Sequence, residues 1–138
     1  MRYYLDTNML FFLLSKQFDE INYDIRYLCE DFSNTLQTSS IAIKELLLLY
    51  RIGKFRSKKY KSETEILTEL KEIGVAIVFF NQHHLNSYSS LRIVSGHKDM
   101  NDHAIIAQSI ADKIPVISSD RKFKEYTTQG LSFVYNKR

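Results

Sequence analysis

Cysteine and proline are almost absent from this chain of 138 residues, which has one of each and only four glycines. The lone cysteine, Cys29, cannot form an internal disulfide and offers no thiolate pair for a zinc site. Because disulfides form and persist mainly in secreted proteins, we expect the chain to work in a reducing compartment, the cytoplasm. With 44% hydrophobic residues, the composition also excludes fibrous and disordered classes.

Long apolar runs are missing as well. The longest run near the amino terminus, Met9–Leu14, is far shorter than the roughly 18 residues that a membrane-spanning helix needs. Asp6 also lies where the apolar part of a secretory signal peptide would be. We therefore expect no membrane segment, and the length suits a single domain over residues 1–138.

Positive charge is concentrated in one short segment, although the net charge of the chain is only +3. This basic cluster, interleaved with Phe55 and Tyr60, consists of Lys54, Arg56, Lys58, Lys59 and Lys61. Basic side chains release counterions from a phosphate backbone and aromatic rings stack on bases, so the pattern favours nucleic-acid binding. A solvated loop or helix face can have the same composition, and the cluster alone does not decide between the two.

Short runs of β-branched and aromatic residues alternate along the chain with helical patterns. Ser39–Ser40 can cap an apolar helix, and Ser62 with Glu65 forms a capping-box sequence before another. Asn81 and Asn101 can cap two later helices. The expected strands are 2–5, 35–38, 75–80, 116–118 and 131–135, and the expected helices are 8–16, 23–32, 41–52, 63–72, 82–93 and 102–112, with a short helix after Asp120.

This alternation predicts an α/β fold with a mostly parallel central sheet. Ligands of such folds bind outside the carboxyl ends of the strands, where the helices that follow the strands also begin. Residues at that edge are therefore the candidates for a functional site.

Four carboxylates that are distant in the sequence are expected at this edge. Asp6 follows the first strand directly, and Asp120 follows the strand 116–118. Asp102 begins the helix that leads antiparallel into that strand, and Glu45 lies one turn into the helix after the second strand. Each aspartate also has a simpler explanation as a helix cap or a first-turn acid, which stabilises a helix by about 1 kcal/mol.

A role as a helix cap or first-turn acid does not explain Glu45, because this residue lies on the apolar side of its helix, with Ile41 and Leu48 and away from Lys44. A carboxylate in that position needs a partner. If the four acids converge, two like charges about 4 Å apart repel by roughly 4 kcal/mol at an effective dielectric constant of about 20. An all-oxygen site suits the hard cations Mg²⁺ or Mn²⁺, which activate water and bind phosphoryl oxygens. The pattern therefore predicts metal-dependent phosphodiester cleavage.

In order and spacing these residues resemble the PIN-domain ribonucleases, especially the VapC-type toxins of type II toxin–antitoxin systems. The resemblance rests on LDTN at 5–8, Glu45, NDHAIIAQ at 101–108 and ISSDRKF at 117–123, and it extends over essentially the whole chain. It implies a three-layer α/β/α sandwich that hydrolyses single-stranded or looped RNA. The acidic quartet that holds Mg²⁺ or Mn²⁺ and forms the catalytic centre would be Asp6, Glu45, Asp102 and Asp120.

The same resemblance assigns supporting roles. Thr7 and Ser118 would hold carboxylates or a water molecule by hydrogen bonds, and Asn8 would lie close to the metal or the substrate. Asp99 would be an outer acid of the site, or simply part of a loop, and the basic cluster would bind the RNA. VapC-type toxins usually form homodimers and are blocked by a cognate antitoxin, so an antitoxin protein and a second copy of the chain are the expected partners.

Other classes remain as alternatives. A receiver module of a response regulator shares the fold class but needs an acidic pair after the first strand, where this chain has Asp6 followed by Thr7 and Asn8. A dehalogenase-like phosphatase needs a second aspartate at the position of Asn8. A PIN nuclease for housekeeping RNA processing, or a PIN-like domain that only binds RNA or protein, would have the same overall pattern. The four histidines lack zinc-type spacing and are interpreted as structural or substrate-contacting residues.

Overall fold

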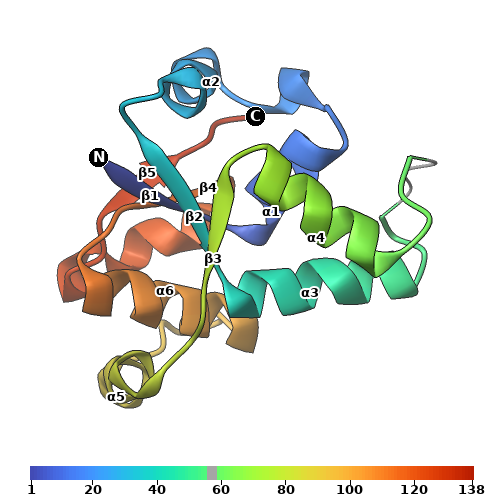
Figure 1. The fold of residues 1–138 in the computed structure, drawn as a ribbon. Helices are drawn as coiled ribbons and strands as arrows, with labels where there is room; N and C mark the ends of the chain where they lie inside the picture. Colours follow the sequence, from blue (N-terminus) through green and yellow to red (C-terminus); the bar gives the residue numbers. More distant parts are fainter. Residues whose placement is uncertain (56–58) are drawn as a thin grey trace.

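A five-stranded sheet forms the centre of the computed structural model, which describes residues 1–55 and 59–138 (Figure 1). Each strand pairs with its neighbours in parallel orientation. The α/β fold class with a parallel central sheet is therefore confirmed. In spatial order the strands are β3 (Val75–Val78), β2 (Thr35–Ser39), β1 (Arg2–Leu5), β4 (Val116–Ser118) and β5 (Phe133–Tyr135).

Helices cover both faces of this sheet and complete the expected three layers. Figure 1 shows α1, α2 and α4 on one side and α5 and α6 on the other, with α3 near the carboxyl ends of the strands. The helical segments are α1 (Thr7–Leu14), η1 (Phe18–Glu20), α2 (Tyr23–Glu30), α3 (Ser40–Arg51), α4 (Glu63–Glu72), α5 (Gln82–Ser90), α6 (Met100–Asp112) and η2 (Arg121–Gln129). Among the described residues, no helix combines the length and apolar character that crossing a membrane requires.

Strand order places a topological switch point between β1 and β4. The chain proceeds from β1 outward to β2 and β3, and then returns across the sheet to β4 and β5. Because right-handed connections that run in opposite directions lie on opposite faces, a crevice opens where the direction reverses. Tyr4 pairs with Val116 and Leu5 with Ile117, so the last residues of β1 and β4 end side by side at this point.

The start of α6 differs from the sequence-based expectation. Asn101 was expected as its cap, but the helix begins at Met100 and its cap is Asp99. One oxygen of the Asp99 carboxylate accepts the backbone N–H groups of Asn101 and Asp102, at 3.0 and 3.2 Å. A carboxylate that satisfies two free N–H groups at the positive end of a helix is a stronger cap than an amide two residues later, because its charge also interacts favourably with the helix dipole.

Two expected strands and one capping box are shorter or less complete than the pattern suggested. The strand expected over 75–80 ends at Val78, and the N–H of Phe80 is taken instead by the hydroxyl of Ser40 at 2.9 Å. The strand expected to begin at residue 131 begins at Phe133. Ser62 caps α4 as expected, but the Glu65 carboxylate accepts the N–H of residue 61 and so does not close the box on Ser62.

The core lies between the sheet and its two helical layers. The largest side chains with under 2% exposure include Tyr4 and Leu5 of β1, Leu10 of α1, Ile106 of α6 and Ile117 of β4. The central strands β1 and β4 are thus buried on both faces, as expected of a parallel sheet between helices. The first candidate site residues lie at the carboxyl ends of these two buried strands.

Candidate active site

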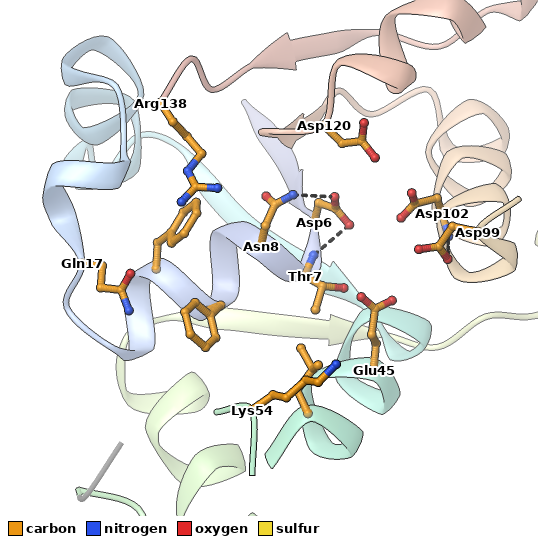
Figure 2. A pocket seen from close by; sticks show the side chains of 13 residues that line it. Asp6, Thr7, Asn8, Gln17, Glu45, Lys54, Asp99, Asp102, Asp120 and Arg138 are labelled. Atoms are coloured by element: carbon orange, nitrogen blue, oxygen red, sulfur yellow. Dashed lines mark hydrogen bonds between the residues drawn. The ribbon is translucent and has the colours of Figure 1, made fainter. Parts of the chain in front are cut away.

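A cavity of about 450 Å³ lies at the carboxyl ends of β1 and β4. Its acidic lining comes from four separate parts of the chain, and the side chains converge on one space (Figure 2). All four acids of the expected quartet line the cavity, together with Asp99. The acidic residues of the lining are Asp6, Glu45, Asp99, Asp102 and Asp120.

Asp6 is the most strongly fixed of these acids. It caps α1 directly after β1 and is only 3% exposed. One carboxylate oxygen accepts the N–H of Thr7 at 2.8 Å, and the other accepts the hydroxyl of Ser118 at 2.7 Å and the side-chain amide of Asn8 at 3.2 Å. The carboxylate is therefore oriented by the start of α1 and by the end of β4 before any ligand binds.

The same polar contacts join β1 to the loop after β4. The hydroxyl oxygen of Ser118 accepts the N–H of Asp120 at 3.0 Å, and the side-chain carbonyl of Asn8 accepts the N–H of Ser119 at 3.2 Å. Ser118 is fully buried. It thus links Asp6 to Asp120 and sets the separation of the two segments that carry them.

Ionising all the carboxyl groups of this cavity at once is energetically costly. Burial raises the pKa of Asp6 to about 6, although hydrogen bonds from Ser118 and Thr7 act in the opposite direction. Burial, followed by the charges of Asp6 and Asp99, raises the pKa of Glu45 to about 7. Burial and then the neighbouring carboxylates raise the pKa of Asp102 well above its usual range. In these three residues burial and the neighbouring negative charges stabilise the neutral carboxyl relative to the charged carboxylate.

Two buried polar atoms in the cavity lining have no hydrogen-bond partner within the described chain. They are Oε2 of Glu45 and the hydroxyl oxygen of Thr7. Buried oxygens without a partner are rare, and a cation that binds oxygen would satisfy both them and the excess negative charge. The donor set, which is rich in carboxylates and lacks thiolates, fits Mg²⁺ or Mn²⁺ better than structural zinc.

Positive charge in the cavity comes from Lys54 and Arg138. In Figure 2 Arg138 lies apart from the acids, whereas Lys54 is drawn on the side of Glu45. The guanidinium of Arg138 contacts the Glu20 carboxylate at 2.6 Å and lies 4.9 Å from the ring centroid of Phe12. Arg138 is therefore partly neutralised. In the described structure neither cation makes a salt bridge to the acids of the cavity.

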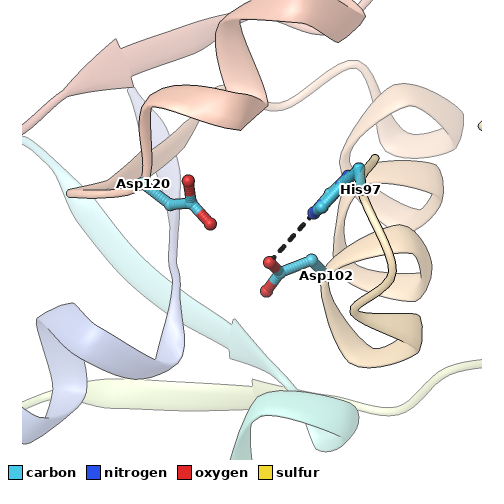
Figure 3. Close-up of side chains that lie close together, drawn as sticks. All are labelled: His97, Asp102 and Asp120. Carbon is cyan, nitrogen blue, oxygen red and sulfur yellow. Dashed lines mark hydrogen bonds and ion pairs between the residues drawn. The ribbon is translucent and has the colours of Figure 1, made fainter. Parts of the chain in front are cut away.

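His97 also belongs to the site, although its place there was not predicted from the sequence. Its Nε2 lies 3.2 Å from Oδ2 of Asp102, and ligand atoms of His97, Asp102 and Asp120 lie within 4.8 Å of one another (Figure 3). The backbone N–H of Val94 donates to the hydroxyl oxygen of Tyr126, and this hydroxyl is hydrogen-bonded to Nδ1 of His97 at 2.7 Å. His97 therefore joins Tyr126 to Asp102 through its two ring nitrogens.

The expected basic cluster is only partly brought to this cavity. Lys54 lines the cavity, whereas the ammonium of Lys59 contacts the Glu69 carboxylate at 3.1 Å, and Lys61 is exposed. Arg56 and Lys58 lie outside the described residues. The role of the cluster in RNA binding stays a prediction.

Comparisons with known proteins agree with this architecture. A family model described as PIN domain matches residues 3–128. The solved structure of VapBC2 from Rickettsia felis bound to a DNA fragment from its promoter contains a chain that is 24% identical, with a TM-score of 0.72 over 99% of this chain and 100% of that one. VapBC-1 from nontypeable Haemophilus influenzae matches at 22% identity and a TM-score of 0.69, with 98% of both chains covered.

A third structure, DNA-bound VapBC from Salmonella typhimurium, matches at 16% identity and a TM-score of 0.65, again with 98% of both chains covered. At these identities the structural likeness establishes a shared fold. No curated protein matches the sequence.

Proposed function

Because the chain belongs to the PIN domain family, whose members are nucleases, we propose that it is a metal-dependent endoribonuclease and the toxin of a toxin–antitoxin pair. The observation that carries this proposal is the convergence of five carboxylates on one cavity, with a buried oxygen of Glu45 left without a partner. A site of this kind suits a reaction in which a bound cation contacts the phosphate group of the substrate.

The metal-binding residues in this proposal are Asp6, Glu45, Asp102 and Asp120. A bound Mg²⁺ or Mn²⁺ would lower the pKa of a coordinated water and stabilise charge on the phosphate. Asp6 supplies a carboxylate whose orientation is set by Ser118 and the Thr7 backbone, so binding costs little rearrangement. Glu45 supplies a free oxygen atom from the facing helix α3.

Supporting residues hold this arrangement in place. Ser118 and Asn8 fix Asp6 and the Asp120 loop, and Asp99 anchors the start of α6, from which Asp102 projects. His97 acts as a positioning residue through its hydrogen bond to Asp102. Carboxylate ligands that are held by such outer hydrogen bonds bind a metal more tightly than unsupported ones.

The substrate and partners follow from the same proposal. Lys54 at the cavity, with the basic cluster around it, supports RNA as the substrate because it offers positive charge to the phosphates next to the site. Residues 1–138 would act as one nuclease domain in the cytoplasm. A cognate antitoxin is proposed because the similar structures are VapBC complexes.

A homodimer is also proposed. Leu48 and Ile52, one turn apart at the end of α3, are 51% and 55% exposed and offer an apolar contact. Sedimentation or light scattering should then give a mass of about twice the 16.3 kDa of one chain, and a Leu48→Glu variant should give the monomer mass.

RNA cleavage is the direct test of this function. We expect purified protein to cut labelled single-stranded RNA with Mg²⁺ or Mn²⁺ and to stop when a chelator is added. Asp102→Asn should lower the rate by at least about 100-fold, since transition-state stabilisation by a metal typically contributes several kcal/mol. Asp19→Asn, an exposed acid on η1, is the matched control and should keep full activity.

Cleavage that persists in the chelator, or an Asp102→Asn variant with unchanged activity, would contradict the proposal. A receiver module would instead bind the metal without cutting RNA, and a domain that only binds RNA would retain the RNA without products. A small reading frame next to the gene, encoding a DNA-binding head and an acidic or amphipathic tail, would favour a toxin over a housekeeping RNA-processing nuclease.

A further inference from the structure

A second cavity, of about 620 Å³, lies beside β5 and η2 and shares no lining residue with the first. It is formed by the short helical segment that follows Asp120 and by the edge strand of the sheet. The residues that line it are Arg121, Lys124, Thr127, Phe133, Tyr135 and Lys137.

The lining of this second cavity is cationic and contains no acid. Arg121, Lys124 and Lys137 are exposed, and none of them takes part in a salt bridge within the described chain. Three uncompensated positive charges around one hollow attract an anion with several negative groups. The charge of this second cavity is therefore opposite in sign to that of the neighbouring acidic cavity.

Aromatic rings form the apolar part of the same lining. The ring centroids of Phe133 and Tyr135 lie 6.0 Å apart, and both rings are half-buried. The guanidinium of Arg121 is held against Tyr135, with its Nε donating to the tyrosine hydroxyl at 3.0 Å and its central carbon 6.0 Å from the ring centroid. Flat rings with fixed cations beside them are what stacked nucleobases and their phosphates require.

The backbone connects this second cavity directly to the acidic one. Arg121 is the residue after Asp120, and Tyr135 of β5 pairs in register with Ser118 of β4. Neighbouring strands lie about 5 Å apart, so the aromatic lining begins roughly one strand spacing from the serine that orients Asp6. A chain of nucleotides with one phosphate in the acidic cavity can therefore continue over the edge of the sheet into the second cavity.

We propose that this second cavity binds the single-stranded RNA segment next to the phosphate that is cut. Lys124 and Lys137 contact the RNA phosphates, and a base stacks on Tyr135. The inference rests on the proposed ribonuclease function and adds the path of the substrate. It places substrate binding at η2 and β5, in addition to the basic cluster near residue 54, where Lys59 is already occupied by Glu69.

RNA binding in the absence of cleavage tests this proposal. The probe is a fluorescein-labelled single-stranded RNA of ten nucleotides and mixed sequence, and its anisotropy is followed in chelator over a series of salt concentrations. We expect the double variant Lys124→Ala/Lys137→Ala to bind at least about tenfold more weakly and to lower the salt slope by about 1.4, the value for two lost contacts to single-stranded phosphates. We expect Tyr135→Ala to bind about tenfold more weakly with a nearly unchanged salt slope, because a stacking contact is lost rather than a charge.

Matched variants separate these effects from general ones. Lys71→Ala removes an exposed lysine on α4 and should leave both affinity and slope unchanged. Tyr135→Phe keeps the ring and loses the hydroxyl, so it should bind more tightly than Tyr135→Ala. Because the two lysines are exposed, the double variant should keep the wild-type melting temperature, and its result stands even if Tyr135→Ala fails to fold.

The outcomes distinguish a failure of this proposal from a failure of the proposed ribonuclease function. If the wild-type protein cuts RNA but the double variant binds and cuts like the wild type, the second cavity is not part of the substrate path and the proposal is wrong. The same result is expected if the cavity serves a protein partner instead. If no RNA is cut under any metal condition, the ribonuclease function fails, whereas weaker RNA binding by the double variant would still support the cavity as an RNA site.

Discussion

Replacing Glu45 by glutamine should stabilise the metal-free protein at alkaline pH. The pKa of Glu45 is raised from 4.5 to about 7 by burial and by the charges of Asp6 and Asp99. Each pKa unit corresponds to about 1.36 kcal/mol, and we allow for screening because the side chain is only half-buried, which leaves a penalty of about 1–2 kcal/mol for the ionised form. Glutamine has nearly the same shape and no charge, so the variant should lack this penalty.

The pH dependence of the effect has a definite sign. Below about pH 4.5 Glu45 is protonated in both the folded and the unfolded chain, and the penalty is absent. As the pH rises, the unfolded chain releases its proton first, so the wild-type protein loses stability until the folded carboxyl is ionised above about pH 7. The two proteins should therefore have similar stability near pH 4.5 and differ most above pH 7.

Thermal unfolding in chelator, followed by circular dichroism from pH 4.5 to 8.5, measures this difference. At the upper end we expect Glu45→Gln to melt about 3–8 °C above the wild type, given the size of the chain. Glu125→Gln, at an exposed position on η2, is the control and should differ little at any pH. A Glu45→Gln variant that is no more stable than the wild type at pH 8.5 would refute the view that charge repulsion destabilises the empty cavity.

Three further variants test other parts of the structure. Ser118→Ala removes the 2.7 Å hydrogen bond to Asp6 and should weaken Mn²⁺ binding by about 10- to 100-fold in a calorimetric titration, and wild-type affinity would show that the serine does not support the site. His97→Phe removes the hydrogen bond to Asp102 and should lower kcat more than it raises KM for RNA, so an effect on KM alone would argue against a positioning role. Tyr4→Phe loses hydrogen bonds to Asp112 and Gln108, which do not line the cavity, and should reduce the free energy of unfolding by about 1–3 kcal/mol without lowering the specific activity of the folded protein; a loss of activity would indicate an unexpected connection to the site.

The acidic cavity could be anticipated from the sequence because its position depends on topology alone. Asp6 and Asp120 follow strands whose carboxyl ends must meet in a parallel sheet, and any helix that leads antiparallel into such a strand begins at the same edge. Glu45 was indicated by its place on an apolar helix face. These inferences need only the order of elements, and that order was largely correct.

Features that depend on loop conformation could not be anticipated in the same way. Asp99 displaced Asn101 as the cap of α6, because the loop brings its carboxylate over two N–H groups. His97 belongs to the same loop, and its ring is held beside Asp102 by a hydrogen bond with Tyr126, which is 29 residues away. No periodicity or spacing in the sequence reports contacts of this kind, and the cavity at η2 and β5 likewise becomes visible only when these segments pack together.

The central claim is that the acidic cavity binds a divalent cation, and calorimetric titration with Mn²⁺ near pH 7 tests it most directly. In two buffers with different heats of ionisation, the wild-type protein should bind Mn²⁺ and release protons, because the raised pKa values of Asp6 and Glu45 leave some carboxyls protonated before binding. The Asp6→Asn variant, once circular dichroism has shown that it is folded, should bind Mn²⁺ far more weakly. Wild-type protein that takes up no Mn²⁺ at millimolar concentration, or an Asp6→Asn variant that binds equally well, would contradict the account.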